Sequence, residues 1–291
     1  MRRILNKIPH HRKGLFYISL TAFLWSSSGL FIKILSVSAY HILFYRSLIA
    51  GLTLLCILYF KERKLDFKPD ILSVLASVSF SGILIFFVVS NKLTTSANAI
   101  FLQFTAPLYL LFLEPLLLKT KFRMRNLITI IACIAGMALF FFEKLEIGSF
   151  YGNIIAVFSG IFFALFSLFL KWKRNLGHSN TLMTIALGNL LVSVICFPLI
   201  YSDMSLTSTQ FFILLYMGVI QIGISYFIFN IGIQYVSATE SMIIGILEAI
   251  FNPIWVFLGV GEIPSINALI GGAIIFAAII IHNMLPENRK A

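Results

Sequence analysis

The chain has 291 residues, of which 59% are apolar and 11% are charged, and its mean hydropathy is +0.98. A soluble globular protein is nearer half apolar and a quarter charged, so this composition excludes an ordinary soluble fold and indicates that the chain folds in a bilayer. The net charge of +11 does not indicate a nucleic-acid partner, because the basic residues stand in short clusters between long apolar runs. The three cysteines lie inside those runs without metal-ligand spacing, and we expect neither a metal nor a cofactor.

Ten apolar runs are long enough to cross a hydrocarbon core of about 30 Å as helices, which takes about 20 residues. In chain order, these spans one to ten cover 15–35, 39–60, 71–91, 95–118, 126–143, 150–170, 181–201, 210–233, 238–260 and 266–284. Backbone polar groups in lipid must be satisfied within the segment, so each span is expected to be helical. The predicted fold class is an all-α integral membrane protein with ten transmembrane helices.

The number of lysines and arginines is high and low in alternate segments between the spans. If the amino terminus is cytoplasmic, the cytoplasmic segments hold 18 of the 22 basic residues, and the opposite side holds only Lys33, Lys92 and Lys144. Cytoplasmic segments of membrane proteins carry such an excess. The sequence therefore predicts a multi-pass protein of the cytoplasmic (inner) membrane with both termini in the cytoplasm.

The chain also contains an internal repeat. Gly14–Lys33 in span one aligns with Gly152–Lys171 in span six at an offset of 138 residues. Lys92–Ala99, which leads into span four, aligns with Gln234–Ser241, which leads into span nine, at an offset of 142. The two offsets are so similar that a single duplication explains both alignments.

This duplication predicts a first five-helix repeat, 1–145, and a second, 146–291. Because five is odd, the second repeat enters the membrane from the opposite face. Inverted repeats of this kind recur in secondary transporters, which bind substrate near the midplane between the halves. The alternative is a duplicated structural bundle without a transport path.

Several short motifs occur in a fixed order along the chain, some in the first half and some in the second. The first half has Leu24-Trp25-Ser-Ser-Ser-Gly29, Lys33, Arg46, Thr95-Ser-Ala-Asn-Ala99 and Thr105-Ala-Pro107, and the second has Tyr235–Thr239, Leu247-Glu248 and Gly261-Glu262. In order and spacing they resemble the EamA-type branch of the drug/metabolite transporter superfamily, over essentially the whole chain. Ala249 and Thr120 depart from the family pattern, which commonly has a proline and an acidic residue there.

The resemblance implies a permease for small metabolites, often amino acids or other amphipathic solutes, and frequently an exporter. It also implies a central cavity lined by spans one to four and six to nine, with spans five and ten at the periphery.

Arg46 lies within span two, roughly 5 Å from the midplane at about 1.5 Å per residue. A charged side chain at the bilayer centre costs about 2.5–3.5 kcal/mol on insertion scales, so it must face a partner or water. Arg46 is therefore a candidate contact for a substrate carboxylate. The alternative is a fixed ion pair or a cap on the backbone carbonyls of a neighbouring helix.

Glu248 lies near the middle of span nine. Ser241, Gly245, Glu248, Asn252 and Trp255 recur at steps of four, three, four and three, which places them on one face of a continuous helix. A face with an acid, an amide and an indole is expected to avoid lipid. Glu248 is a candidate to bind an ammonium group or carry a coupling proton; the alternative is a structural pair with Arg46 or a bond to a helix end.

Other polar or aromatic residues at a similar depth complete the set of substrate-binding candidates. In the first half they are Trp25, Ser28, Asn98, Gln103, Thr105 and Tyr109, and in the second Tyr226, Asn230, Asn252 and Trp255. Asn98, Thr105 and Tyr109 share one face of span four if it is a straight helix, and Gln103 is offset from that face. A packing role is the alternative at each position, above all for Trp25.

The predicted function is a secondary transporter of small metabolites that works by alternating access, with proton coupling as an open question. The alternatives are a facilitator without coupling and, further off, a membrane-embedded enzyme. Nucleotide-binding, zinc-protease and serine-hydrolase motifs are all absent from the sequence, which disfavours a pump acting alone or an enzyme. The expected partners are a small-molecule substrate and the lipid bilayer, and the candidate assembly is a homodimer.

Overall fold

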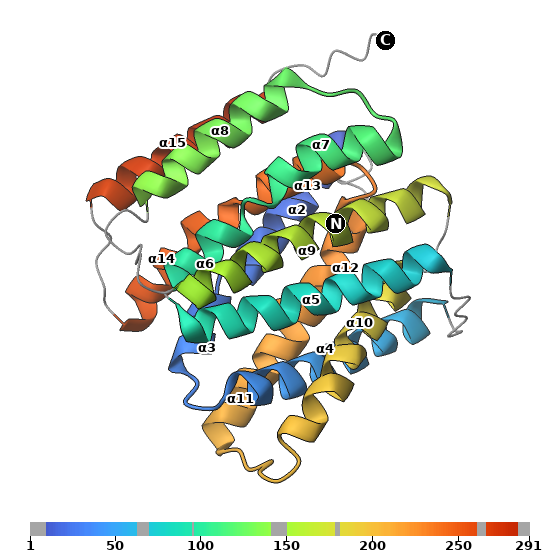
Figure 1. The fold of residues 1–291 in the computed structure, drawn as a ribbon, viewed down its shortest axis with the longest axis vertical. Coiled ribbons are helices and arrows are strands. Elements are labelled where there is room, and N and C mark those ends of the chain that lie inside the picture. Colours follow the sequence, from blue (N-terminus) through green and yellow to red (C-terminus); the bar gives the residue numbers. More distant parts are fainter. Residues whose placement is uncertain are drawn as a thin grey trace.

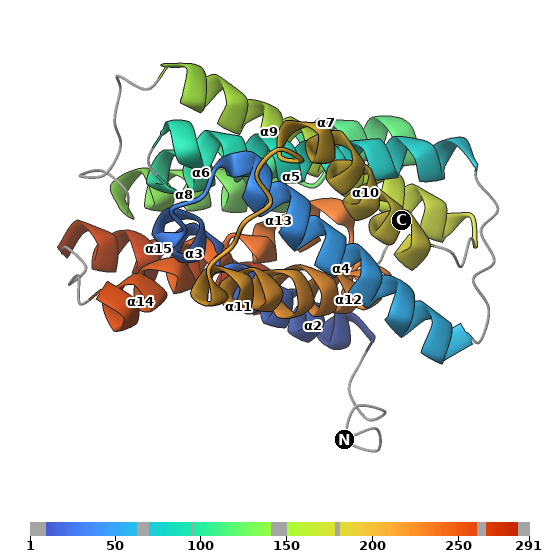
Figure 2. The ribbon, with the colours of Figure 1, turned by 90° about the horizontal axis from the view of Figure 1, so that it is seen from below.

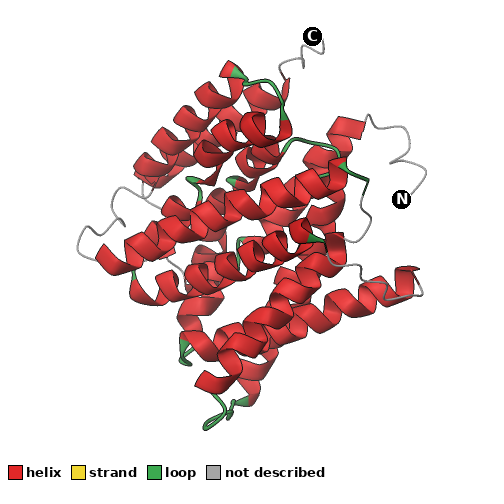
Figure 3. Cartoon of the chain, turned by 45° about the vertical axis from the view of Figure 1, so that its right-hand side comes forward, coloured by secondary structure: helices red, strands yellow, loops and turns green. Residues whose placement is uncertain are grey.

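A computed structural model describes residues 10–62, 70–94, 96–140, 150–177, 181–260 and 266–284, and almost all of them are helical (Figure 3). The first half contains α2 (His10–Trp25), α3 (Ser28–Ile34), α4 (Ala39–Glu62), α5 (Ile71–Leu93), α6 (Ser96–Gln103), α7 (Ala106–Leu118) and α8 (Met124–Phe140). The second contains α9 (Phe150–Asn175), α10 (Thr181–Cys196), α11 (Ser208–Tyr216), α12 (Ser225–Gly232), α13 (Ala238–Gly245), α14 (Leu247–Val260) and α15 (Ile266–Met284). Thr95, Gly261 and Glu262, which contribute to the resemblance, lie outside the described residues.

These helices confirm the predicted all-α membrane fold. Seven segments of the described chain are long and apolar enough to cross a bilayer: His10–Ile34, Ala39–Lys61, Ile71–Leu93, Asn98–Leu118, Phe150–Asn175, Thr181–Leu199 and Ser208–Gly232. Met124–Leu139 and Leu269–His282 are shorter apolar helices, at spans five and ten. The remaining predicted span, the ninth, is formed by α13 and α14.

Two lysine contacts show that the halves are built alike. Lys33, at the end of α3, donates a hydrogen bond of 3.0 Å to the carbonyl oxygen of Thr94. Lys171, its counterpart in α9, donates one of 2.6 Å to the carbonyl oxygen of Val236. Thr94 and Val236 are related by the sequence offset of 142. The same bond therefore forms once in each half, at opposite ends of the spans.

Two glycines of the repeat also have equivalent surroundings, each in the other half. A Cβ atom on Gly14 would lie 2.8 Å from side-chain atoms of Tyr235 and Val236. A Cβ atom on Gly152 would lie 2.8 Å from the Thr94 Cβ and 3.0 Å from the Leu93 carbonyl carbon. Spans one and six each need glycine at this position because the neighbouring connection comes too close for a side chain. The contacts relate the halves by an approximate two-fold axis.

Four spans are interrupted within the bilayer rather than being continuous helices. Span four breaks at Phe104–Thr105, and its repeat equivalent, span nine, breaks at Ile246. Span one breaks at Ser26–Ser27, where the Ser26 hydroxyl donates to the Phe23 carbonyl oxygen at 2.6 Å. In span eight a π-helical segment, Met217–Ile224, separates α11 from α12. Such breaks free backbone groups and redirect side chains, and they are frequent at functional sites.

The interrupted spans lie at the centre of the helix arrangement. α8 and α15 pack against each other at one edge of the molecule (Figure 1), as the resemblance implies for spans five and ten. In Figure 2, α5 and α9 lie on one side and α2, α12 and α14 on the other. α5 packs chiefly on α9, and α2 on α12. The space between these two groups is the place for a central site.

Candidate functional site

A small cavity, about 40 Å³ in volume, lies between the two halves. Its lining consists of Trp25, Ser28, Arg46, Ile83, Leu84, Phe87, Gln103, Phe163, Gln221, Ile222, Tyr226 and Glu248. These residues come from spans one to four, six, eight and nine, so span seven, which the resemblance also places at the cavity, does not contribute.

Four of the polar lining residues sit at helix interruptions. Ser28 begins α3 after the break in span one, and Gln103 ends α6 before the break in span four. Gln221 lies in the π-helical segment of span eight, and Glu248 is in the first turn of α14 after the break in span nine. Four interrupted spans therefore deliver one polar side chain each to the same cavity.

Arg46 and Glu248 face this cavity from opposite halves, and both are buried, at 1% and 6% exposure. Among the described residues no carboxylate lies within 4.0 Å of the Arg46 guanidinium, so the ion pair with Glu248 considered above does not form. The Arg46 Nε and Nη2 atoms also lack a hydrogen-bond partner there, which removes the capping alternative for these two nitrogens. Ser28, from the first half, lines the same cavity as Glu248.

Two further buried groups of the lining have unused hydrogen-bonding capacity. The Trp25 Nε1 donor and the Gln221 Oε1 acceptor have no partner among the described residues. The Gln221 amide is oriented by its other end, because Nε2 donates to the Ser27 hydroxyl at 3.0 Å. Buried polar groups are rarely left unpaired, so this cavity can accept a ligand with both acceptor and donor groups.

Aromatic side chains form the remaining wall of the cavity. The Tyr226 ring lies 4.8 Å from the Trp25 ring and 4.6 Å from that of Phe80, measured between centroids. Trp25 also contacts Phe163 at 5.7 Å. An aromatic wall favours an apolar body on the ligand and can stabilise a cationic group over a ring face. Trp25 thus combines the packing role with a place in the lining.

Three candidates of span four lie outside the cavity lining. The Asn98 side-chain amide donates to Thr94 Oγ1 at 3.0 Å and to Asn153 Oδ1 at 2.9 Å, near the end of the helix. The Thr105 hydroxyl lies 2.6 Å from the Leu102 carbonyl oxygen and 3.2 Å from the Tyr109 phenol. The expectation of one shared face assumed a straight helix. Because span four breaks at Phe104–Thr105, the offset residue, Gln103, faces the cavity instead.

Three candidates of the second half also lie beside the cavity rather than in its lining. The Asn252 amide donates to the Ser26 carbonyl oxygen at 2.8 Å, and the Trp255 indole donates to the Ser26 hydroxyl at 2.7 Å. Both bonds clamp α14 to the break in span one. Asn230 offers its carbonyl oxygen to Arg174 at 2.9 Å, and its side-chain Oδ1 has no partner in the described chain. The polar face predicted for span nine is therefore divided. Glu248 faces the cavity, whereas Asn252 and Trp255 bond Ser26 and hold α14 in place.

We expect Asn252→Leu to lower the stability of the folded protein by about 1–3 kcal/mol, because it leaves the buried Ser26 carbonyl oxygen without this donor. Transport at saturating substrate should fall more than apparent affinity, since Asn252 positions Ser28 without lining the cavity. The midpoint of thermal unfolding in detergent and the concentration dependence of uptake measure the two effects. Asn230→Leu, the same change at an asparagine with an unbonded side-chain oxygen, is the control and should cost less. An equal loss in both variants would contradict this role.

Gln221, Phe87 and Phe163 were not among the sequence candidates. Gln221 stands in an otherwise apolar run, Met217–Ile224, and a buried amide in such a run is a usable signal. Its orientation depends on the π-helical segment, which hydrophobic periodicity does not predict. Gly218 in this segment allows close packing on α4, since a Cβ atom there would lie 2.6 Å from Ile49.

Inverted repeats, interrupted helices and buried charged groups around a central cavity define a membrane transporter. The model of the EamA-like transporter family matches residues 12–142 and 150–284, one match for each half. The chain belongs to the EamA-like transporter family, within the drug/metabolite transporter superfamily, whose members are transporters rather than enzymes.

Comparison with solved structures supports the same fold. One crystal structure, solved for a protein with 16% sequence identity, superposes with a TM-score of 0.80 and covers 94% of this chain and 98% of that one. At this identity the likeness concerns the fold alone. The comparison with curated proteins gives no match.

Proposed function

We propose that this chain is a permease that exports small zwitterionic or amphipathic metabolites, with amino acids as the leading class, by alternating access. The observation that carries the proposal is the pair Arg46 and Glu248: a buried arginine and a buried glutamate line one cavity without pairing with each other. A charged group in a low-dielectric site is costly unless it is paired. A substrate with a carboxylate and an ammonium group would pair with both.

The other lining groups fit the same class of ligand. The unpaired donors are the Arg46 guanidinium and the Trp25 indole, which suit a carboxylate. The available acceptors are the Glu248 carboxyl group and Gln221 Oε1, which suit an ammonium group. The aromatic wall of Trp25, Phe163 and Tyr226 suits an apolar side chain. Export as the direction of transport is proposed on the family resemblance.

Alternating access is supported by the equivalence of the halves, which we propose to act as two repeats, 1–145 and 146–291, that exchange conformations. The matching bonds of Lys33 and Lys171 at opposite ends of the spans are the kind of contact such an exchange uses. We place the ends that carry most lysines and arginines, and both termini, in the cytoplasm, on the basis of the charge bias.

The proposal is tested by uptake into liposomes that contain the purified protein. A mixture of labelled metabolites is offered first, and matched sets follow: an amino acid, its carboxamide, and its analogue without the amino group. The proposal predicts uptake of the amino acid well above protein-free liposomes and weak uptake of both derivatives. Equal uptake of all three compounds would contradict zwitterion recognition by Arg46 and Glu248.

A further inference from the structure

The first turns of α6 and α13 are equivalent positions of the inverted repeat, and they lie at opposite ends of the spans. Asn98 in α6 corresponds to Glu240 in α13 at the offset of 142. Each side chain reaches across to the other half of the chain. Alternating access requires one such closure to open while the other stays shut, so these two places are natural gates.

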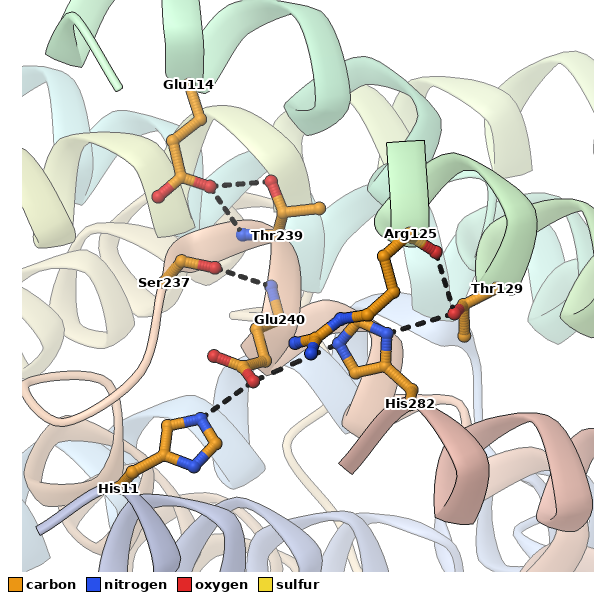
Figure 4. Close-up of polar contacts among 8 residues, drawn as sticks. All are labelled: His11, Glu114, Arg125, Thr129, Ser237, Thr239, Glu240 and His282. Atoms are coloured by element: carbon orange, nitrogen blue, oxygen red, sulfur yellow. Dashed lines mark hydrogen bonds and ion pairs between the residues drawn. The ribbon is translucent and has the colours of Figure 1, made fainter. Parts of the chain in front are cut away.

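At the cytoplasmic end, Glu114 of α7 holds the start of α13. Its carboxylate oxygens accept hydrogen bonds from the backbone N–H group of Thr239, at 2.8 Å, and from the Thr239 hydroxyl, at 2.6 Å (Figure 4). They also accept one from the backbone N–H group of Ala238, at 3.0 Å. Glu114 is only 4% exposed. A carboxylate at a helix N-terminus is favourable, and here a helix of the first half supplies it to a helix of the second.

Glu240 makes a second connection between the halves beside the first. His11 of α2 lies 2.8 Å from its carboxylate, and His282 of α15 lies 3.9 Å from it (Figure 4). The His282 ring in turn bonds the Thr129 hydroxyl of α8 at 2.9 Å. α13 is thereby tied to α2, α7 and α15 at one end of the molecule.

Charged groups from every neighbouring helix act on this cluster. Glu240 interacts electrostatically with His11, His282 and Lys171. His282 interacts with Arg123 and Arg125, and Lys171 interacts with Glu114 as well as with Glu240. Of these side chains, histidine is the one that ordinarily changes charge between about pH 5 and pH 8.

At the equivalent closure at the opposite end, amide side chains connect the two halves. Asn98 bonds Asn153 at 2.9 Å, and the Thr94 hydroxyl donates to the same Asn153 oxygen at 3.0 Å. Lys33 lies beside them with its bond to the Thr94 carbonyl oxygen. The His11–Glu240 pair therefore stands at one closure, and the Asn98–Asn153 pair, with Lys33 beside it, stands at the other.

We propose that the His11–Glu240 pair and the Glu114 cap together form the cytoplasmic gate of this carrier, and that protonation of His11 holds the gate shut. The proposal rests on the alternating access inferred above. At low cytoplasmic pH the imidazolium pairs with the Glu240 carboxylate. As the pH rises the imidazole becomes neutral, the bond loses its charge assistance, and the cavity opens to the cytoplasm more often.

The test uses thiol labelling, which needs no substrate. Cys56, Cys133 and Cys196 are replaced by alanine, and a single cysteine is introduced by Ser28→Cys in the cavity lining. In inside-out vesicles, a membrane-impermeant maleimide reaches that cysteine only through the cytoplasmic gate. Glu240→Gln and Glu114→Gln should each be labelled at least about tenfold faster, the change expected when a charge-assisted hydrogen bond is lost.

The pH dependence is read as the labelling rate divided by that of the His11→Gln variant at the same pH, which cancels the reactivity of the thiol. This ratio should rise between about pH 6 and pH 8 as His11 loses its proton. Asn98→Ala, at the equivalent position of the other repeat, is the control: it should speed labelling in right-side-out vesicles only.

Unchanged cytoplasmic labelling in both glutamate variants would overturn the gate, as would faster labelling from both sides. A ratio that stays flat with pH would overturn the role of His11. Failure of the proposed transport function is distinguishable, because the thiol introduced by Ser28→Cys would then be labelled from one side alone under all conditions.

Discussion

Arg46→Ala is expected to reduce the apparent affinity for a zwitterionic substrate by about 10- to 150-fold, the equivalent of one charged hydrogen-bonding partner at 1.5–3 kcal/mol. The guanidinium lines the cavity, is 1% exposed, and has two nitrogens without partners among the described residues. A neutral substrate of the same shape should lose much less. Uptake measured over a range of concentrations, for the amino acid and for its carboxamide, gives the comparison.

Two variants control for the loss of a large buried side chain. Arg46→Lys keeps the charge and loses the forked geometry, so it should retain part of the affinity. Arg174→Ala removes another partly buried arginine, one that donates to the Asn230 carbonyl oxygen outside the cavity lining, and should leave substrate selectivity unchanged. If Arg46→Ala weakens charged and neutral substrates equally, Arg46 is a structural residue.

Glu248→Gln should remove the response of transport to a pH gradient, provided that Glu248 carries the coupling proton. The side chain is 6% exposed and shares the cavity with Arg46 and Ser28. Glutamine keeps the shape and hydrogen-bonding capacity of glutamate but cannot take up or release the proton. Uptake into liposomes with and without an imposed pH gradient measures the effect, which should fall to the level of zero gradient.

Glu248→Asp, which retains a titratable carboxyl group, is the matched control and should keep a response to the gradient. The competing account is a facilitator in which Glu248 only binds the ammonium group of the substrate. In that case the wild-type protein itself shows no gradient response, and Glu248→Gln weakens binding alone. A variant that still responds to the gradient as the wild type does would exclude Glu248 as the proton carrier.

The membrane fold could be predicted from the sequence because its determinants are long and repeated. Runs of about 20 apolar residues have few alternatives in a bilayer. The alignment of Lys33 with Lys171 anticipated a pair of equivalent bonds that the structure contains. The terminal orientation and the exact limits of the repeats rest on the charge bias and the alignments.

The site was less predictable because its geometry depends on where helices stop. Arg46 and Glu248 could be singled out by the cost of charge in the membrane, and both line the cavity. Thr105 and Asn252 were placed by helical periodicity, which assumes an unbroken helix. Span four breaks at Phe104–Thr105 and span nine at Ile246. Gln103, before the first break, faces the cavity, and Asn252, after the second, bonds Ser26.

The interrupted spans also explain why the amides were hard to assign from their residue type. Asn98 and Gln103 are five residues apart in span four, yet one bridges to Asn153 near the end of the span and the other faces the cavity. An amide in an apolar run indicates that some polar contact exists. Its position relative to the break decides whether that contact lies near the end of the span or in the cavity.

The central claim, a carrier that exposes one cavity alternately to the two sides, is tested most directly by counterflow. Liposomes with the reconstituted protein are loaded with excess unlabelled amino acid and diluted into a trace of the labelled compound. An alternating-access carrier predicts a transient accumulation of label above its equilibrium level, because each outward passage of unlabelled substrate returns the empty site for an inward one. Simple equilibration of the label without this overshoot, at a rate proportional to concentration, would contradict the carrier and indicate an open path.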